Sequence, residues 1–260
     1  MDEWLTVEYA RRRRQSSMET DHFHTEYEIY FLVSGSVEYF IDGSLYQLTA
    51  GSFALIPPGM LHRTVKYKDG AQERILIMLD PRFLTAFSEL DASLFDCFDR
   101  FCVLVPSESE QYANLLHLLC REYQRGKPNG VLLRAYMAQL LVLLGREDAV
   151  PRVPYAPDDI QTRRILEAVA YINEHYADDI DRGLLCRRIF ISPSHFSRLF
   201  KQVTGFTYVE YLRTVRLKNG ARLLTEAKRN VTGVAAACGF SSSNHFCKQF
   251  KAAMGMSPLQ

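Results

Sequence analysis

The sequence predicts a two-domain α+β protein, with an N-terminal β-barrel and helical hairpin followed by an all-α domain. The length of 260 residues suits two domains of ordinary size. Short apolar runs separated by turn signals fill the first third, and a repeated helical motif fills the last third. With 47% apolar and 23% charged residues, the composition excludes a largely disordered chain.

The β-barrel prediction rests on residues 27–67, which are rich in Ile, Val, Phe and Tyr. Turn signals at Ser34-Gly35, Asp42-Gly43 and Ala50-Gly51 punctuate this segment. Asp-Gly between the apolar runs 37–41 and 45–48 is a strong hairpin signal. With a further strand over 74–79, this spacing indicates a sandwich or barrel.

The helical hairpin is predicted from residue 107 onwards, where the apolar period changes. Ser107-x-x-Glu110 is read as a capping box, and leucines then recur at helical spacing up to residue 123. After a break at 126–130, a second helix covers 131–144. Its leucines suit either packing on the barrel or a dimer surface. The proline-containing segment 149–158 is the predicted linker between domains 1–148 and 159–260.

Charge is distributed unevenly along the chain. Residues 1–157 hold 16 Lys+Arg and 21 Asp+Glu, whereas residues 181–260 hold 13 and 3. An acidic first half and a basic end favour a regulatory module joined to a module that binds a polyanion. No apolar run reaches the ~20 residues that span a bilayer, and the N-terminus lacks signal-peptide character. We therefore expect a cytoplasmic protein with reduced cysteines, because none of its six cysteines forms a C-x-x-C pair.

The basic end contains an internal repeat with a period of 50 residues. His195-Phe-Ser-Arg-Leu-Phe-Lys201 precedes Gly205, and His245-Phe-Cys-Lys-Gln-Phe-Lys251 precedes Gly255. In each copy the apolar residues recur at helical spacing, which places the polar residues on the opposite face. A short apolar helix precedes each copy, so each unit is predicted to be a helix-turn-helix.

The segment between the two units is predicted to be one helix over residues 207–225. Thr207-x-x-Glu210 forms a capping box at its start. At 1.5 Å per residue, a helix of this length is roughly 28 Å long. Since successive major grooves lie ~34 Å apart on one side of B-DNA, such a rod can place both units in adjacent grooves.

A possible metal-ligand set lies in the predicted barrel. His22, His24 and Glu28 share parity along an extended strand, so their side chains face one side, and His62 comes from a strand across the barrel. Three imidazoles and a carboxylate suit a divalent transition metal. The pattern of these residues with Gly35, Gly51 and Pro57-x-Gly59 resembles the two motifs of the cupin superfamily. That resemblance implies a cupin-like barrel, and satisfied polar residues lining a ligand pocket are the alternative to a metal site.

Residues 160–258 resemble the DNA-binding domain of AraC/XylS-type transcription regulators. The resemblance is carried by the segment 191–201, Gly205, Tyr211-Leu-x-x-x-Arg216, Gly239-Phe-Ser and Gly255-Met-Ser-Pro258. The chain departs from the family pattern at Phe190, where glycine is favoured, and at Cys186, where alanine is favoured. By matched position, the residues implied to contact bases or phosphates are Ser194, His195, Ser197, Arg198, Lys201, Asn244, His245, Lys248 and Lys251.

The resemblance implies a sequence-specific regulator of transcription controlled by a small-molecule effector, such as a sugar or related metabolite. The expected partners are double-stranded DNA, the effector, a second copy of the chain and RNA polymerase, with no membrane. No cofactor is required. A metal-dependent cupin enzyme and a basic adaptor that contacts protein are the alternatives. We expect no enzyme, because the sequence contains no Ser-His-Asp set, P-loop or dinucleotide fingerprint.

Overall fold

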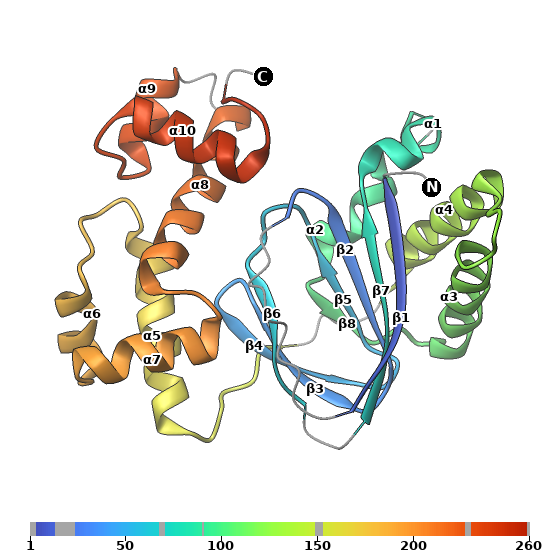
Figure 1. Cartoon of the computed structure of the whole chain (residues 1–260), viewed down its shortest axis with the longest axis horizontal. Coiled ribbons are helices and arrows are strands. Elements are labelled where there is room, and N and C mark those ends of the chain that lie inside the picture. The colour runs from blue at the N-terminus through green and yellow to red at the C-terminus, as the bar shows by residue number, and fades with distance from the viewer. Residues whose placement is uncertain are drawn as a thin grey trace.

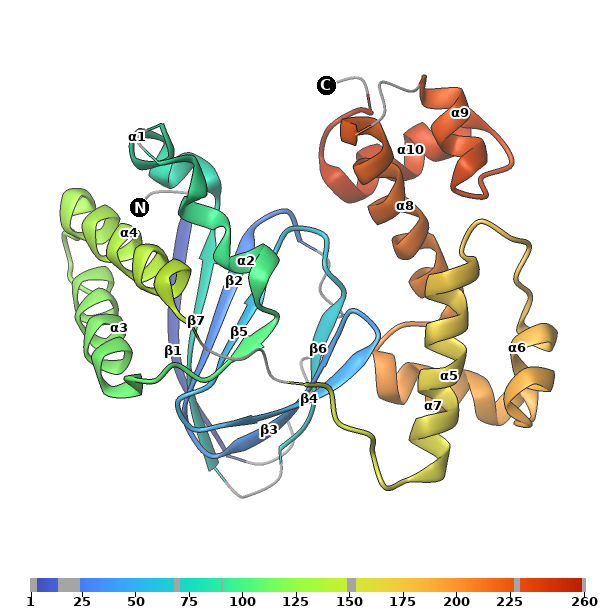
Figure 2. The same cartoon turned by 180° about the vertical axis from the view of Figure 1, so that it is seen from behind.

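The computed structural model describes residues 4–13, 24–67, 71–89, 91–148, 153–226 and 230–258. An N-terminal β domain, covered on one side by helices, lies beside a C-terminal helical domain (Figures 1 and 2). The predicted α+β class with two domains is therefore confirmed.

The β domain consists of two antiparallel sheets. The five-stranded sheet has the order β1-β7-β2-β5-β8 and the three-stranded sheet has the order β4-β3-β6. Among the described residues these are separate hydrogen-bonded sheets, so the predicted β-barrel is open and consists of two facing sheets. The strands are β1 (Leu5–Arg13), β2 (Tyr27–Ser34), β3 (Ser36–Ile41), β4 (Ser44–Thr49), β5 (Phe53–Ile56), β6 (His62–Tyr67), β7 (Ala71–Leu79) and β8 (Val103–Leu104).

The predicted Asp-Gly hairpin joins β3 to β4. Ile41 pairs with Ser44 across a two-residue turn. Asp42 and Gly43 both have positive φ, at 46° and 94°. This is the backbone of a type I′ turn, whose twist matches that of the flanking strands.

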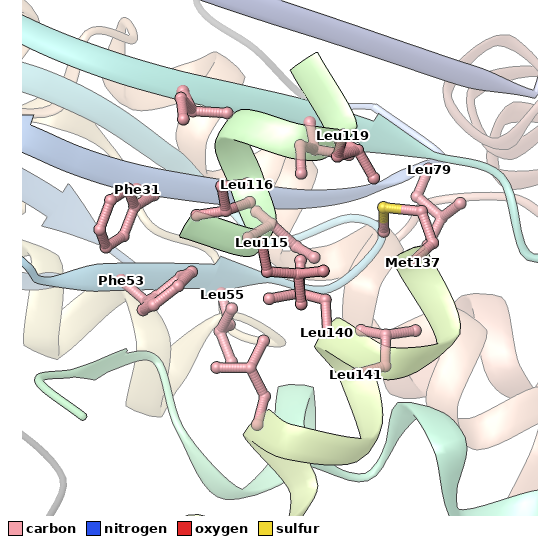
Figure 3. Packing of buried hydrophobic residues seen from close by; sticks show 14 of the residues in the cluster. Phe31, Phe53, Leu55, Leu79, Leu115, Leu116, Leu119, Met137, Leu140 and Leu141 are labelled. Atoms are coloured by element: carbon pink, nitrogen blue, oxygen red, sulfur yellow. The ribbon is translucent and has the colours of Figure 1, made fainter. Parts of the chain in front are cut away.

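The five-stranded sheet separates two cores. One face packs against the helices that follow β7, through Phe31, Phe53, Leu55 and Leu79, and Figure 3 shows these side chains against leucines of α3 and α4. The other face meets the three-stranded sheet, where Tyr30 and Tyr39 are buried with aliphatic neighbours. The helical elements on the first face are η1 (Pro81–Leu84), α1 (Thr85–Ser88), η2 (Ala92–Phe95), α2 (Cys97–Arg100), α3 (Ser109–Tyr123) and α4 (Gly130–Arg146).

The helical hairpin α3–α4 is present, but one predicted cap is wrong. Helix α3 begins at Ser109, and its N-cap residue Glu108 makes no side-chain cap bond. Because the helix begins one residue later than the capping box requires, the hydroxyl of Ser107 does not cap its first turn. Helix α4 is capped instead by Asn129, whose side chain accepts hydrogen bonds from the amides of Val131 and Leu132.

The helical domain contains α5 (Ile160–His175), α6 (Arg182–Ile189), α7 (Pro193–Thr204), α8 (Tyr208–Glu226), α9 (Val231–Ala237) and α10 (Ser243–Met254). The capping box at the start of α8 is confirmed: the amide of Thr207 donates to Glu210 at 2.8 Å, and the amide of Glu210 donates to Thr207 Oγ1 at 3.3 Å. None of the described helices has the length and hydropathy needed to cross a membrane. Helix α4 ends at Arg146 and α5 begins at Ile160, so the linker bounds of 149–158 stay a prediction.

The first helix-turn-helix, α6–α7, packs directly on the three-stranded sheet. Phe40, Leu45 and Leu61 of the β domain belong to the same buried cluster as residues of α5, α7 and α8. Lys218 of α8 pairs with Asp42 at 2.7 Å, in the hairpin turn. The second unit, α9–α10, has its own core, in which the described residues all come from the helical domain. Figures 1 and 2 both show α8 leading from one unit to the other.

Candidate DNA-reading helices and polar cluster

Helices α7 and α10 each bury one face and expose the other. Phe196 and Phe200 are buried in the first unit, as are Phe246 and Phe250 in the second. The polar residues singled out by the repeat lie on the open faces. Those that are exposed are Ser194, Ser197, Arg198, Lys201, Asn244, His245, Lys248 and Lys251, and His195 is half-buried. Their exposure leaves the two faces accessible to a nucleic acid.

The ends of the two helices explain the repeated glycines. Helix α7 ends at Gly205 with φ 90°, and α10 ends at Gly255 with φ 72°. A left-handed residue at this position lets its amide reach back to a carbonyl of the last turn, here that of Lys201 and Lys251. Glycine takes this conformation without the steric cost of a Cβ atom.

The turns inside the two units differ in one residue. Gly239 follows α9 with φ 75°, whereas Phe190 occupies the corresponding end of α6 with φ 55°. The Phe190 side chain is 82% exposed. A left-handed aromatic residue costs roughly 1–2 kcal/mol, and the burial of this ring does not offset that cost.

Two of the basic residues along α8 have structural partners. Arg216 donates from Nε to the carbonyl of Tyr176 at 2.7 Å and from Nη2 to that of Asp178 at 2.8 Å. Lys218 forms the ion pair with Asp42. These two side chains hold the helical domain together and attach it to the β domain, whereas Arg213 is exposed.

Three of the four predicted pocket residues converge at the end of the β domain. His24 Nε2 lies 3.2 Å and His62 Nε2 lies 3.1 Å from the same oxygen of Glu28, and Tyr39 donates its hydroxyl to the other oxygen at 3.0 Å. Glu28 and His62 are buried. Strand β2 begins at Tyr27, so His24 reaches the cluster from the preceding bend and not from the strand, which corrects the parity argument. His22 lies outside the described residues. We call His24, Glu28 and His62 the polar cluster.

The hydrogen bonds of the polar cluster fix the tautomers of its imidazoles. His24 Nδ1 lies 2.9 Å from the carbonyl of Glu26, and His62 Nδ1 lies 2.8 Å from that of Met60. A carbonyl only accepts, so each Nδ1 carries a proton. Each Nε2 then faces a carboxylate oxygen, which also only accepts. The arrangement therefore requires protons on Nε2 or a cation among the three side chains.

The charges of the cluster shift its titration. Burial favours a higher pKa for Glu28, but the charge of His62 and the hydrogen bonds from both imidazoles outweigh it and hold this pKa well below the ordinary value. Burial acts to lower the pKa of His62, yet the carboxylate of Glu28 raises it. Burial next to Glu28 raises the pKa of Tyr39, so its hydroxyl stays protonated.

The polar cluster fits a divalent metal by its donors and spacing. Its ligand atoms all lie within 4.8 Å of one another. The separations of 3.1 and 3.2 Å suit ligands that share one ion at about 2.0–2.2 Å. Backbone carbonyls that hold the far nitrogen of each imidazole are the usual outer support of such sites.

The residues that sequence reasoning missed are Thr64, Gln72 and Arg74, which are buried between the two sheets. Gln72 and Arg74 break the apolar alternation of β7 at positions that face the interior. That break in the apolar pattern is visible in the sequence and could have predicted buried polar side chains. The contact between the β domain and the first unit had no such signal, because it joins residues far apart in the chain.

The helical domain carries two helix-turn-helix units, and the β domain to which it is joined contains a buried polar cluster. This combination is that of a DNA-binding transcription regulator with a ligand-binding domain. Residues 5–141 match the family model described as AraC-like ligand binding domain, and residues 185–260 match a helix-turn-helix domain model. The chain belongs to the AraC family of transcription regulators.

Among its relatives is the transcriptional activator RhaS of Escherichia coli strain SE11, which is 25% identical over 244 residues, covering 92% of this chain and 85% of RhaS. Fatty acid-bound ToxT from Vibrio cholerae aligns over 99% of this chain and 94% of its own, with TM-score 0.43 and 12% identity. The DNA-binding domain of AdpA in complex with a target DNA covers 37% of this chain and 86% of its own, with TM-score 0.36 and 32% identity. The metal-dependent enzyme hypothesis finds no support in these relatives.

Proposed function

We propose that α7 and α10 read two successive major grooves, and that a small molecule bound inside the β domain controls how they engage DNA. The observation that carries the proposal is the exposure of Arg198 and Lys248 at equivalent places on two helices whose apolar stripes are buried. An arginine offers a bidentate donor to guanine, and Asn244 offers a bidentate pair to adenine. Lys201 and Lys251, one turn later, suit phosphates.

Control by the effector follows from the contact between the domains. The β3–β4 hairpin holds the connecting helix α8 through the Asp42–Lys218 ion pair. Strand β6 holds the first unit through Arg63, which donates to the carbonyl of Lys201 in α7 at 3.2 Å. An effector that favours one arrangement of the sheets shifts the position of the first unit relative to the second. The change in DNA affinity equals the difference in effector affinity between the two arrangements. The protein acts by binding and not by catalysis, in the cytoplasm where its DNA is.

The test is selection of genomic fragments by the purified protein, followed by binding titrations on the selected duplex at several salt concentrations. Arg198→Ala plus Lys248→Ala should weaken specific binding about 100-fold or more, because each base contact contributes ~1–3 kcal/mol. Arg121→Ala plus Lys127→Ala removes the same charge from the exposed surface of the hairpin and should leave binding unchanged. Equal losses in both double variants, or no preference among fragments, would exclude the reading role.

We further propose a homodimer that contacts RNA polymerase when bound upstream of a promoter. The dimer proposal is supported by Leu118, Val131 and Leu132 of the α3–α4 hairpin, which are 45%, 76% and 39% exposed. These positions lie away from the face that packs on the sheet. Sedimentation should give a dimer at micromolar concentration, and a monomer there would reject this surface.

We also propose that the polar cluster holds a divalent transition metal, which regulation does not require for any chemical step. The support is the convergence of two imidazole Nε2 atoms and a carboxylate, whose ligand atoms lie within 4.8 Å of one another. Metal analysis of protein purified without chelator should find about one ion per chain, and His62→Ala should lose it. If the purified protein contains no metal and still binds DNA, the metal proposal is rejected. The cluster would then be a set of hydrogen-bonded side chains that line the effector pocket.

A further inference from the structure

Three buried side chains between the two sheets have polar atoms without partners. These atoms are Thr64 Oγ1, Gln72 Nε2, and both Nε and Nη1 of Arg74. The three residues are 1%, 2% and 1% exposed. A buried polar group left unsatisfied costs about 1–3 kcal/mol, and a charged group costs more. Folded proteins keep such groups where a water, ion or ligand completes them.

The unpaired atoms belong to one region of the interior. Tyr30 of β2 donates to Gln72 Oε1 at 3.2 Å, which leaves the amide nitrogen of Gln72 as the open end. The ring of Tyr30 lies 5.7 Å from the Arg74 guanidinium and 5.1 Å from the ring of Tyr39. Thr64 is the cross-strand partner of Tyr39. The donors therefore surround a pair of tyrosine rings shared by the two sheets.

Among the described residues, the one ion pair of Arg74 lies on the side of the guanidinium that faces the protein surface. The guanidinium of Arg74 forms an ion pair through Nη2 with Glu8 at 3.3 Å, and the Glu8 side chain is 45% exposed. The buried acid of the interior, Glu28, already accepts from His24, His62 and Tyr39. The inner nitrogens of Arg74 thus lack an anion. Nearly all the open atoms are donors, and two of them belong to a guanidinium, so a complementary ligand must bring acceptor oxygens.

We propose that the effector is a small hydroxylated carboxylic acid, held through its carboxylate by the guanidinium of Arg74, with Gln72 and Thr64 bonding to its other oxygens. A carboxylate accepts charge-assisted hydrogen bonds from a guanidinium, which are roughly twice as strong as those that a neutral sugar hydroxyl would accept. This inference rests on the proposed function, since it places the effector inside the β domain. It narrows the expected ligand from a sugar or related metabolite to a hydroxylated carboxylic acid.

The experiment follows the melting temperature of the full chain with sodium formate, sodium acetate and sodium D-glucuronate. Sodium chloride and methyl glucoside serve as controls at matched ionic strength. Formate and acetate are the smallest carboxylates, and glucuronate adds hydroxyl groups. At tenfold excess over its Kd, a carboxylate should raise the melting temperature by about 2–4 °C, and the controls should not. If none of the three salts exceeds sodium chloride, the proposal is wrong.

Variants separate binding from folding. Arg74→Met should remove the carboxylate-dependent shift. Without ligand it should melt close to the wild type, because it removes buried donors that have no partner together with one partly exposed ion pair to Glu8. Arg82→Met removes an exposed arginine, paired with Asp80, and should keep the full shift. If Arg74→Met does not fold, Gln72→Leu should weaken carboxylate binding at least threefold. A full shift in Arg74→Met, or an unchanged carboxylate Kd in Gln72→Leu, would overturn the assignment.

Parallel DNA titrations keep the two proposals distinguishable. Sequence-selective DNA binding without any carboxylate effect overturns the acid effector and leaves the regulator intact. Carboxylate binding at Arg74 in a protein that shows no sequence preference overturns the proposed function and leaves the site standing.

Discussion

Gly239→Ala tests the turn that orients the second reading helix. Gly239 has φ 75°, and an added Cβ would lie 2.5 Å from the carbonyl oxygen of Ala177 and 3.0 Å from Arg216 Nη2. The oxygen belongs to the backbone, and Arg216 is fixed by two carbonyls, so neither neighbour moves freely. The left-handed conformation costs alanine about 1–2 kcal/mol, and overpacking adds about 1–3 kcal/mol. Alanine also restricts the unfolded chain, which stabilises the folded state by about 0.4–1 kcal/mol and offsets part of this cost.

The expected net loss is therefore about 2–4 kcal/mol, measured by urea unfolding followed by circular dichroism. Gly255→Ala is the matched control, since it has φ 72° but no atom within 4 Å of the added Cβ. It should cost about 1 kcal/mol or less, because only the backbone strain remains. Gly239→Ala should also weaken binding to a two-site duplex more than to a single half-site. Equal unfolding free energies for the two variants would refute the clash argument.

Three further outcomes follow from local chemistry. Hydrogen bonds from Thr207 lower the pKa of Glu210. The stabilisation of α8 by this carboxylate is therefore present above its ordinary pKa of 4.5 and is lost as the pH falls below that value. Glu210→Gln should flatten this part of the curve of unfolding free energy against pH. Burial raises the pKa of Cys120 to about 11, so iodoacetamide at pH 8 should modify the partly exposed Cys247 first, as peptide mass spectrometry would show. Asp42→Asn removes a half-exposed ion pair, so it should change the unfolding free energy by less than about 1 kcal/mol while altering the effector dependence of DNA affinity. A large loss of stability there, with no change in that dependence, would contradict the coupling role.

Local signals in the sequence predicted local structure well. The Asp42-Gly43 turn and the Thr207–Glu210 capping box are each specified by neighbouring residues, and both are present. The 50-residue repeat predicted two helices with the observed buried faces, because helical periodicity depends only on the segment itself. The capping box predicted at Ser107 is absent although its short-range pattern is present in the sequence. Helix α3 begins at Ser109, so the pattern alone does not set the first residue of the helix.

Features that depend on distant partners could not be predicted in this way. His24 reaches Glu28 from a bend, and only the folded backbone shows where β2 begins. The residues 74–79 gave the strand β7 but not the meaning of Arg74, because an unpaired donor is defined by the absence of neighbours in space. The packing of Phe40 against Tyr211 likewise arises from the meeting of two domains.

The hydrogen bond from Arg63 to the carbonyl of Lys201 joins a strand of the β domain to the last turns of a reading helix. Any tilt of α7 that a particular promoter imposes is therefore transmitted back into the sheet. Linkage requires the operator to change effector affinity by the same factor as the effector changes operator affinity. Each promoter would thus set its own threshold concentration for the signal, so one protein can switch several genes at different metabolite levels.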